Sequence, residues 1–144
     1  MIREVWQENF GAHPEAFVRD FLLSPRALDD IDRAAAEMDG NCLFLVQEVR
    51  RRVVATGAAY GASQDTCELA RMFVALAWRR HGLARSLAGH LLDFARAKNF
   101  RSVRLSSNRQ LTASHRLYHS LGFRRCANWA AVDDGYSVYM QLEL

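Results

Sequence analysis

A basic turn that contains one glycine carries the clearest chemical pattern in this sequence. It follows a strand-like segment, residues 68–74, and precedes an amphipathic segment with the period of a helix. Gly82 lets the backbone approach a bound group, and four basic side chains surround it: Arg79, Arg80, His81 and Arg85. The first N–H groups of a helix lack intrahelical partners and lie at the positive end of its dipole. The turn therefore predicts a phosphate site.

Two segments of the chain resemble one known family. Arg79, Gly82 and Ala84 have the spacing R/Q-x-x-G-x-G/A, which resembles the acyl-CoA pyrophosphate loop of the GNAT superfamily of N-acetyltransferases. Leu117 to Phe123, with the sequence LYHSLGF, is similar to the LYxxLGF signature of that family. The resemblance covers most of the chain and is sharpest over residues 68–123. For the turn taken alone, the alternative is a solvated helix start with basic side chains.

The chain departs from the commoner family pattern in the turn. Leu76 stands where proline is frequent, and Arg80 stands where glycine is frequent. Neither departure removes an essential backbone N–H group. The anion site is therefore expected to survive both changes.

The resemblance implies acetyl-CoA as co-substrate. The backbone of Met72, Phe73 and Val74 is then expected to pair with the pantetheine arm, where two neighbouring strands splay apart and leave backbone groups unpaired. The pyrophosphate is expected to be wrapped by the turn and the helix start: Arg79, Arg80, His81, Gly82, Leu83, Ala84 and Arg85. For His81 alone, the alternative is an exposed loop residue.

Asn108 is a further candidate cofactor residue. Many members carry an asparagine seven residues before the signature tyrosine, whereas this chain has Leu111 there. Asn108 lies nearby, at the end of an expected strand, and can take that place. The alternative is a turn or cap residue, which is the commoner role of an asparagine after a strand.

Tyr118 is the candidate general acid. The resemblance implies that this tyrosine reaches the CoA sulfur and donates a proton as the thiolate leaves. The alternative is packing, because Leu117 and Leu121 lie on the same expected helix and aromatic residues at helical spacing usually belong to a core.

Glu68 is the candidate general base. Counted back from the turn, it resembles the catalytic glutamate of the histone-acetyltransferase branch, and strand alternation places it on one face with Met72 and Val74. A carboxylate there is expected to take the ammonium proton directly or through water. The alternatives are a solvated strand carboxylate or an ion-pair partner for Arg71.

Other reaction classes find no support in the sequence. His115 and His119 have a spacing that can hold zinc, but they lack a third ligand, and solvent exposure explains them better. We therefore predict no metal. The chain has no GxSxG elbow, HExxH motif or Walker lysine.

Composition indicates one soluble globular domain, residues 1–144. The three cysteines form no CxxC pair and are expected to be reduced thiols, with Cys67 in the core. The net charge of +3 is spread over small basic groups, so no nucleic-acid partner is expected. No apolar run approaches a membrane span and the start of the chain lacks a signal peptide, so we predict a cytoplasmic protein without a membrane partner.

The order of the elements predicts an α/β fold of mixed α+β type. The expected GNAT-like architecture is a mostly antiparallel twisted sheet with a parallel splayed strand pair and helices on both faces. A first strand over residues 2–10 and two helices, from Pro14 to Leu22 and from residue 26 to 38, precede a hairpin whose basic turn is at residues 50–52. The strand before the basic turn, the helix after it and a strand at 103–105 form a right-handed βαβ unit. A helix at 112–121 that Gly122 ends leads to a final antiparallel pair, 123–129 and 136–142, across the turn at Asp133 to Gly135.

The sequence thus predicts an acetyl-CoA-dependent N-acetyltransferase that acetylates a primary amine of a small molecule by direct attack in a ternary complex. Peptide or protein N-acetylation remains an alternative, as does a non-catalytic acyl-CoA-binding or RNA-binding module on the same fold. The acceptor is expected to meet the N-terminal helices, the 61–66 loop and the 128–136 region, none of which carries a motif. A homodimer through the last strands is a further expectation.

Overall fold

The structure is a computed structural model that describes residues 41–144. The strand predicted at 2–10 and the two helices predicted up to residue 38 lie outside the described residues. Within residues 41–144, no helix has the length and apolar content that a membrane crossing requires.

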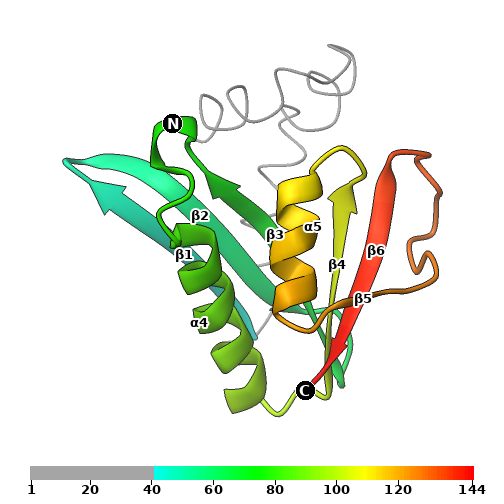
Figure 1. The fold of residues 1–144 in the computed structure, drawn as a ribbon. Coiled ribbons are helices and arrows are strands. Elements are labelled where there is room, and N and C mark those ends of the chain that lie inside the picture. Colours follow the sequence, from blue (N-terminus) through cyan, green and yellow to red (C-terminus); the bar gives the residue numbers. More distant parts are fainter. Residues whose placement is uncertain (1–40) are drawn as a thin grey trace.

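The described chain builds one sheet with two helices packed against it (Figure 1). The sheet has six strands in the order β1-β2-β3-β4-β6-β5, and every neighbouring pair is antiparallel except β3 and β4. The strands are β1 (Cys42–Val49), β2 (Arg52–Gly61), β3 (Thr66–Val74), β4 (Ser102–Asn108), β5 (Arg124–Arg125) and β6 (Ser137–Glu143). The predicted mixed sheet with one parallel pair is confirmed.

The hairpin of β1 and β2 closes through the basic turn that the sequence predicts. Arg50 and Arg51 both have positive φ, 49° and 62°, and Val49 pairs with Arg52. Two left-handed residues between paired strands form a turn whose twist matches that of the strands. The turn is therefore a two-residue connection built without glycine.

A bulge interrupts the pairing of β2 with β3. The register shifts between Thr56 and Ala58, Arg71 has a φ of 56°, and the Thr56 hydroxyl donates a hydrogen bond to the Arg71 carbonyl at 2.8 Å. A Cβ at Gly57, opposite the bulge, would lie 2.8 Å from Met72 Sδ. Glycine at this position therefore makes room for the side chain that the bulge redirects.

Because of this bulge, the predicted alternation of side chains along β3 is wrong. Leu69 belongs to the core beneath the helices, and Met72 points to the same side, beside Gly57 and Leu91. Tyr60 pairs with Glu68 on the opposite face. Glu68 therefore does not share a face with Met72 and Val74, because one extra residue in a strand reverses the alternation beyond it.

The parallel strands β3 and β4 separate partway along their length. They pair over Thr66–Leu69 and Ser102–Leu105, and neither strand pairs with the other beyond these residues. Beyond this point Ala70, Phe73 and Val74 pair with β2, and no described strand pairs with the other edge of these three residues. The predicted splay is confirmed, and it leaves an edge of β3 open to a ligand strand.

Both described helices pack on one face of the sheet (Figure 1). Helix α4 (Leu83–Ala97) buries one stripe against the strands: Leu87, Ala88, Leu91, Leu92 and Ala95. Two further apolar residues of α4, Leu83 and Phe94, are only half-buried. Cys67, predicted in the core, is fully buried there.

Helix α5 (Thr112–Ser120) ends as predicted. Gly122 has a φ of 101°, and the Phe123 N–H donates to the Tyr118 carbonyl at 3.0 Å. This six-residue closure with a left-handed glycine is a Schellman cap, which satisfies carbonyls at the helix end. The glycine thereby fixes where Phe123 enters the core.

The predicted strand at 123–129 is mostly wrong. Only Arg124 and Arg125 form β5, paired with Gln141 and Met140, and residues 126–136 are a loop. Trp129 turns inward and its ring meets Tyr139 edge to face, at 5.2 Å between centroids. Asp134 accepts hydrogen bonds from the Tyr136 and Ser137 N–H groups, so the turn at 133–135 leads into β6 instead of joining two long strands.

Candidate active site

The basic turn leads into the start of α4, where the sequence predicts an anion site. A short 3-10 helix, η2 (Leu76–Trp78), follows β3, and Gly82 at the N-cap has a φ of 80°. A Cβ at Gly82 would meet no heavy atom within 4 Å, so the backbone there lies open. The Ser86 N–H is the first to bond back, to the Gly82 carbonyl, so the N–H groups of the preceding helical turn have no intrahelical acceptor.

The start of α4 opens on a broad depression shared with α5. The depression has a volume of about 490 Å³, and its lining combines three arginines with small and apolar residues: Arg80, Gly82, Arg85, Ala113, Arg116, Leu117 and Ser120. Arg80 lies in the turn, Arg85 on α4 and Arg116 on α5. The sequence reasoning missed Arg116, although its position two residues before Tyr118 is the signal that relates it to the site.

Arg79 and His81 make contacts within the turn itself. Arg79 Nε donates to the Val74 carbonyl at 2.9 Å, and His81 Nδ1 lies 2.8 Å from the Arg79 carbonyl oxygen. These bonds tie the turn to the end of β3. Their predicted role in holding a cofactor stays a prediction, and the contacts give both residues a part in shaping the loop.

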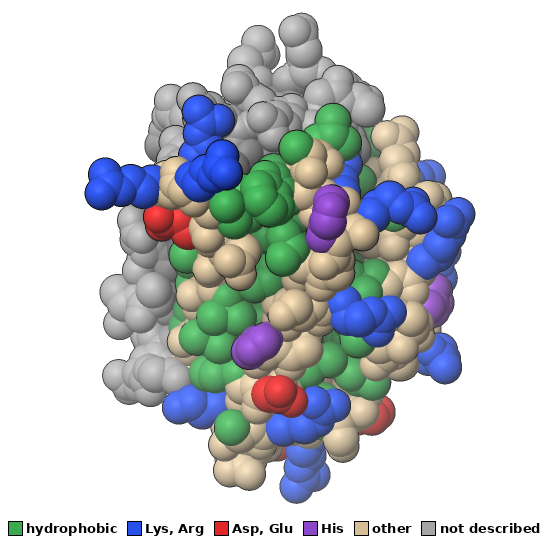
Figure 2. Space-filling view, turned by 60° about the vertical axis from the view of Figure 1, so that its left-hand side comes forward, with side chains coloured by type: hydrophobic (Ala, Val, Ile, Leu, Met, Phe, Trp, Pro, Cys, Tyr) green, Lys and Arg blue, Asp and Glu red, His purple; other side chains and the backbone are tan. Residues whose placement is uncertain are grey.

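Basic side chains lie in several separate groups on the face that Figure 2 shows. A nucleic-acid surface requires a continuous basic track along the backbone of its ligand. The described side chains on this face form no such track.

The strand end at Met72 to Val74 lies beside this turn. Phe73 is 2% exposed, and the Ala75 N–H donates to the Val54 carbonyl at 2.8 Å, so the chain is anchored where β3 ends. Among residues 41–144, the side of β3 that faces β4 has no ladder partner here. The predicted pantetheine contact thus has an accessible edge, and the contact itself stays a prediction.

Tyr118 is a residue of α5, and its side chain lies in the core. It is 6% exposed, and its ring meets Phe123 edge to face at 5.9 Å. Burial raises the pKa of the Tyr118 phenol to about 12, so the group stays protonated at neutral pH. Within residues 41–144 its hydroxyl has no hydrogen-bond partner. Tyr118 therefore packs in the core, which is the alternative interpretation of this residue. Its hydroxyl keeps its proton.

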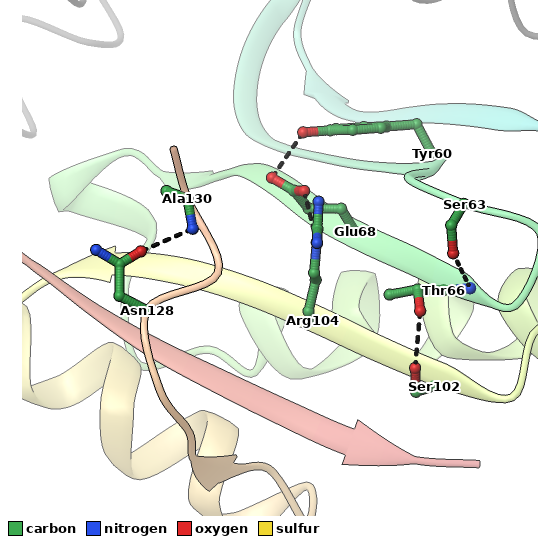
Figure 3. A network of polar contacts seen from close by, with 8 residues as sticks. All are labelled: Tyr60, Ser63, Thr66, Glu68, Ser102, Arg104, Asn128 and Ala130. Carbon is green, nitrogen blue, oxygen red and sulfur yellow. Dashed lines mark hydrogen bonds and ion pairs between the residues drawn. The ribbon is translucent and has the colours of Figure 1, made fainter. Parts of the chain in front are cut away.

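Glu68 is bound on both carboxylate oxygens (Figure 3). The Tyr60 hydroxyl donates to Oε1 at 2.7 Å, and Arg104 Nε donates to Oε2 at 3.1 Å. The ion-pair alternative considered Arg71, and the structure shows Arg104 instead. The register explains this, because Glu68 stands directly opposite Arg104 in the parallel ladder.

Asn108 has the contacts of a turn residue. Its Oδ1 accepts a hydrogen bond from the Gln110 N–H at 2.9 Å, and its carbonyl accepts from the Leu111 N–H at 3.0 Å. These bonds join the end of β4 to α5. They match the alternative interpretation, and contact with a cofactor stays a prediction.

The predicted exposure of His115 is wrong. His115 is 9% exposed and its Nε2 lies 3.2 Å from Ser107 Oγ, because the side chain faces β4. Burial lowers the pKa of the imidazole below its ordinary value of 6.5. His119 stays exposed, and no group of three metal-ligating side chains occurs among the described residues.

Comparison with known proteins agrees with this geometry. The sequence matches the model of the "Acetyltransferase (GNAT) family" over residues 1–123. N-acetylaspartate synthetase of Danio rerio is 37% identical over 97 residues, which are 67% of this chain and 34% of that protein. The Homo sapiens protein of the same name is 38% identical over 96 residues, 66% of this chain and 32% of its own length. The chain thus spans about a third of these curated relatives.

The fold is similar to that of a solved structure. A putative acetyltransferase from Salmonella typhimurium, solved with its cofactor acetyl-CoA, is 25% identical with a TM-score of 0.72. The alignment covers 99% of this chain and 86% of that one. With the open edge of β3, the glycine turn and the LYHSLGF helix in place, the chain belongs to the acetyltransferase (GNAT) family.

Proposed function

We propose that this protein is an acetyl-CoA-dependent N-acetyltransferase that acetylates a primary amine of a small molecule. The observation that carries the proposal is the depression between α4 and α5, where arginines from three segments surround the open N-terminus of α4. Beside it, β3 presents the unpaired edge that an extended ligand can join. An anion site next to an open strand edge suits a long ligand with phosphates at one end.

The described residues fit acetyl-CoA, which supplies the acyl group as a thioester. Free N–H groups at the start of α4 and the side chains of Arg80, Arg85 and Arg116 hold the phosphates. The β3 backbone from Met72 to Val74 receives the pantetheine arm. Its N–H groups near Val74 polarise the thioester carbonyl, and holding both reactants together supplies much of the acceleration.

Tyr118 and Glu68 have the proposed acid and base roles. Tyr118 donates its proton to the departing sulfur, which its raised pKa permits because the phenol is protonated at neutral pH. Glu68 accepts the ammonium proton, directly or through water. If it does so, Glu68→Gln lowers kcat roughly 100-fold without changing the Kd for acetyl-CoA, whereas an unchanged kcat removes this role.

The names of the relatives support a narrower class of acceptor. They are named for N-acetylaspartate, an acetylated amine that bears two carboxylates. A small amino acid is accordingly the proposed acceptor of this chain in preference to a peptide. The homodimer and the cytoplasmic location remain predictions from the sequence.

Isothermal titration with acetyl-CoA tests the cofactor site. Wild-type protein is expected to bind, and Arg116→Gln is expected to weaken binding by about tenfold because a charge-assisted hydrogen bond is lost. Arg96→Gln is the matched control, since Arg96 lies exposed in the last turn of α4 and pairs with Asp93. No binding by the wild type, or equal weakening in both variants, contradicts the proposal.

Acetyl transfer is then followed by release of free CoA thiol with a panel of amines. Transfer to amino acids and not to peptides supports the small-molecule acceptor. Transfer to peptides alone shows that the acceptor class is wrong while the acetyltransferase activity stands. Binding of acetyl-CoA without transfer to any amine favours a non-catalytic binding module.

A further inference from the structure

Arg104 is held rigidly by two neighbours on the face of the sheet away from α4 and α5. Its Nε donates to Glu68 Oε2 at 3.1 Å, and its guanidinium carbon lies 3.9 Å from the centre of the Trp129 ring. Stacking on Trp129 and the ion pair through Nε together fix the plane of the guanidinium. The orientation of the group is therefore set before any ligand arrives.

The outer end of the Arg104 guanidinium meets no acceptor in the part of the chain that the structure describes. Across residues 41–144, neither Nη group donates a hydrogen bond to the protein, and the side chain is 27% exposed. Two parallel N–H groups in one plane match the two oxygens of a carboxylate. Arg104 thus presents a fork prepared for a carboxylate.

This fork stands at the point where the strands part. Glu68 pairs with Arg104 in the parallel ladder, and the next pair, Leu69 with Leu105, is the last before β3 and β4 separate. The loop between Asn128 and Ala130 passes over the same face (Figure 3). Asn128 Oδ1 accepts a hydrogen bond from the Ala130 N–H at 2.7 Å, which tightens the loop around Trp129.

The phenol beside the fork stays neutral. The charges of Arg71 and Arg104 lower the pKa of the part-buried Tyr60 hydroxyl, whereas burial and the charge of Glu68 raise it more strongly. Tyr60 therefore donates a hydrogen bond to Glu68 Oε1 and adds no negative charge beside Arg104.

We infer that Arg104 binds a carboxylate of the acceptor and makes the protein selective for amines that carry one, such as small α-amino acids. The inference rests on the proposed acetyl transfer. It assigns Glu68, Tyr60 and Trp129 to positioning the guanidinium. The acceptor amine then lies beside the open part of β3, and its carboxylate lies one residue pair away, where the strands still meet.

Two matched acceptor pairs test this selectivity: L-aspartate with L-asparagine, and L-alanine with L-alaninamide. In at least one pair, the wild type is expected to use the carboxylate member with a kcat/KM about tenfold higher or more. Arg104→Gln is expected to bring that ratio close to one by raising KM for the carboxylate member. Its kcat/KM with the amide member is expected to fall less than its kcat/KM with the carboxylate member, because only the loss of the Glu68 ion pair affects both acceptors. Its Kd for acetyl-CoA is expected to stay within about threefold of the wild type.

Two further variants separate recognition from folding. Arg104→Lys keeps the charge opposite Glu68 but lacks the planar fork, so its KM for the carboxylate member is expected to lie between those of wild type and Arg104→Gln. Arg101→Gln is the matched control, because Arg101 precedes β4 and is 82% exposed beside Asp65. Thermal unfolding shows that each variant is folded at the assay temperature.

The outcomes also separate the inference from the proposed function. Failure of the wild type to bind acetyl-CoA overturns both. Transfer with equal preference for both members of each pair, or equal loss for both members in Arg104→Gln, overturns only the Arg104 assignment. Bound acetyl-CoA with no transfer to any of the four acceptors also overturns that assignment and leaves the cofactor site standing.

Discussion

Arg85 Nη2 donates a hydrogen bond to Ser120 Oγ at 2.6 Å, which joins the first turn of α4 to the last turn of α5. Ser120 Oγ in turn donates to the Leu117 carbonyl at 2.6 Å. The bond crosses the depression that we assign to the phosphates. It holds the Arg85 guanidinium at the site, so less side-chain entropy is lost when a ligand binds.

Loss of Arg85 and loss of Ser120 are expected to differ in their effect on acetyl-CoA. Arg85→Gln removes a charge and is expected to raise Kd roughly tenfold, whereas Ser120→Ala only frees the arginine and should change Kd by less than about threefold. Isothermal titration at fixed salt measures both. Equal effects of the two substitutions on Kd would mean that the hydrogen bond between Arg85 and Ser120 matters more than the charge of Arg85.

Tyr118→Phe is expected to separate acid catalysis from packing. The hydroxyl has no hydrogen-bond partner among residues 41–144, so its loss should change the free energy of unfolding by less than about 1 kcal/mol. If Tyr118 protonates the sulfur, kcat falls roughly 100-fold and Kd for acetyl-CoA changes little. Steady-state kinetics and urea unfolding measure the two effects, and an unchanged kcat leaves Tyr118 with packing alone.

The pKa of Tyr118 also fixes the expected pH profile. Burial raises this pKa to about 12, so the phenol stays in its acid form throughout the neutral range. No loss of kcat through ionisation of Tyr118 is therefore expected between about pH 6 and pH 9. A fall in kcat over that range that is absent from Tyr118→Phe would contradict the raised pKa.

Two glycine substitutions are expected to have opposite effects on the free energy of unfolding. Gly89 lies within α4 and a Cβ there meets nothing within 4 Å, so Gly89→Ala should stabilise by about 0.5–1 kcal/mol. Gly122 has a φ of 101°, and a Cβ would lie 3.0 Å from Leu142 Cδ1. Gly122→Ala is therefore expected to destabilise by roughly 1–2 kcal/mol. Urea unfolding checks both, and loss of stability in Gly89→Ala would show an unrecognised constraint on α4.

His115 is expected to make stability depend on pH. Its folded pKa is lowered by burial, so the unfolded chain binds the proton more readily. His115 therefore lowers the free energy of unfolding once the pH falls below the ordinary value of 6.5, and it has little effect at neutral pH. When the pH is lowered from about 7 to about 5, the free energy of unfolding of His115→Gln should fall less than that of the wild type. Urea unfolding measures this difference. His90→Gln, at an exposed position on α4, is the control, and an identical slope in wild type and His115→Gln would contradict the lowered pKa.

Local signals made the hairpin, α4 and α5 predictable from the sequence. The basic turn at residues 50–52, Gly82 before α4 and Gly122 after α5 each mark a boundary through the conformation of a few neighbouring residues. The motif of the turn and the LYHSLGF segment also indicated the family, which the comparison confirmed. Such patterns are readable because capping and turn formation depend on residues close in the chain.

Contacts between distant residues were decided by the tertiary structure. Strand register selected Arg104 as the partner of Glu68, a bulge opposite Gly57 reversed the face of Met72, and the packing of α5 brought Arg116 to the turn. Trp129 left its predicted strand to stack on Arg104. The sequence by itself determined the hairpin, α4, α5, the family and the glycine turn before α4. The partners of each site residue depend on register and helix packing, which arise from summed long-range burial and leave no local pattern.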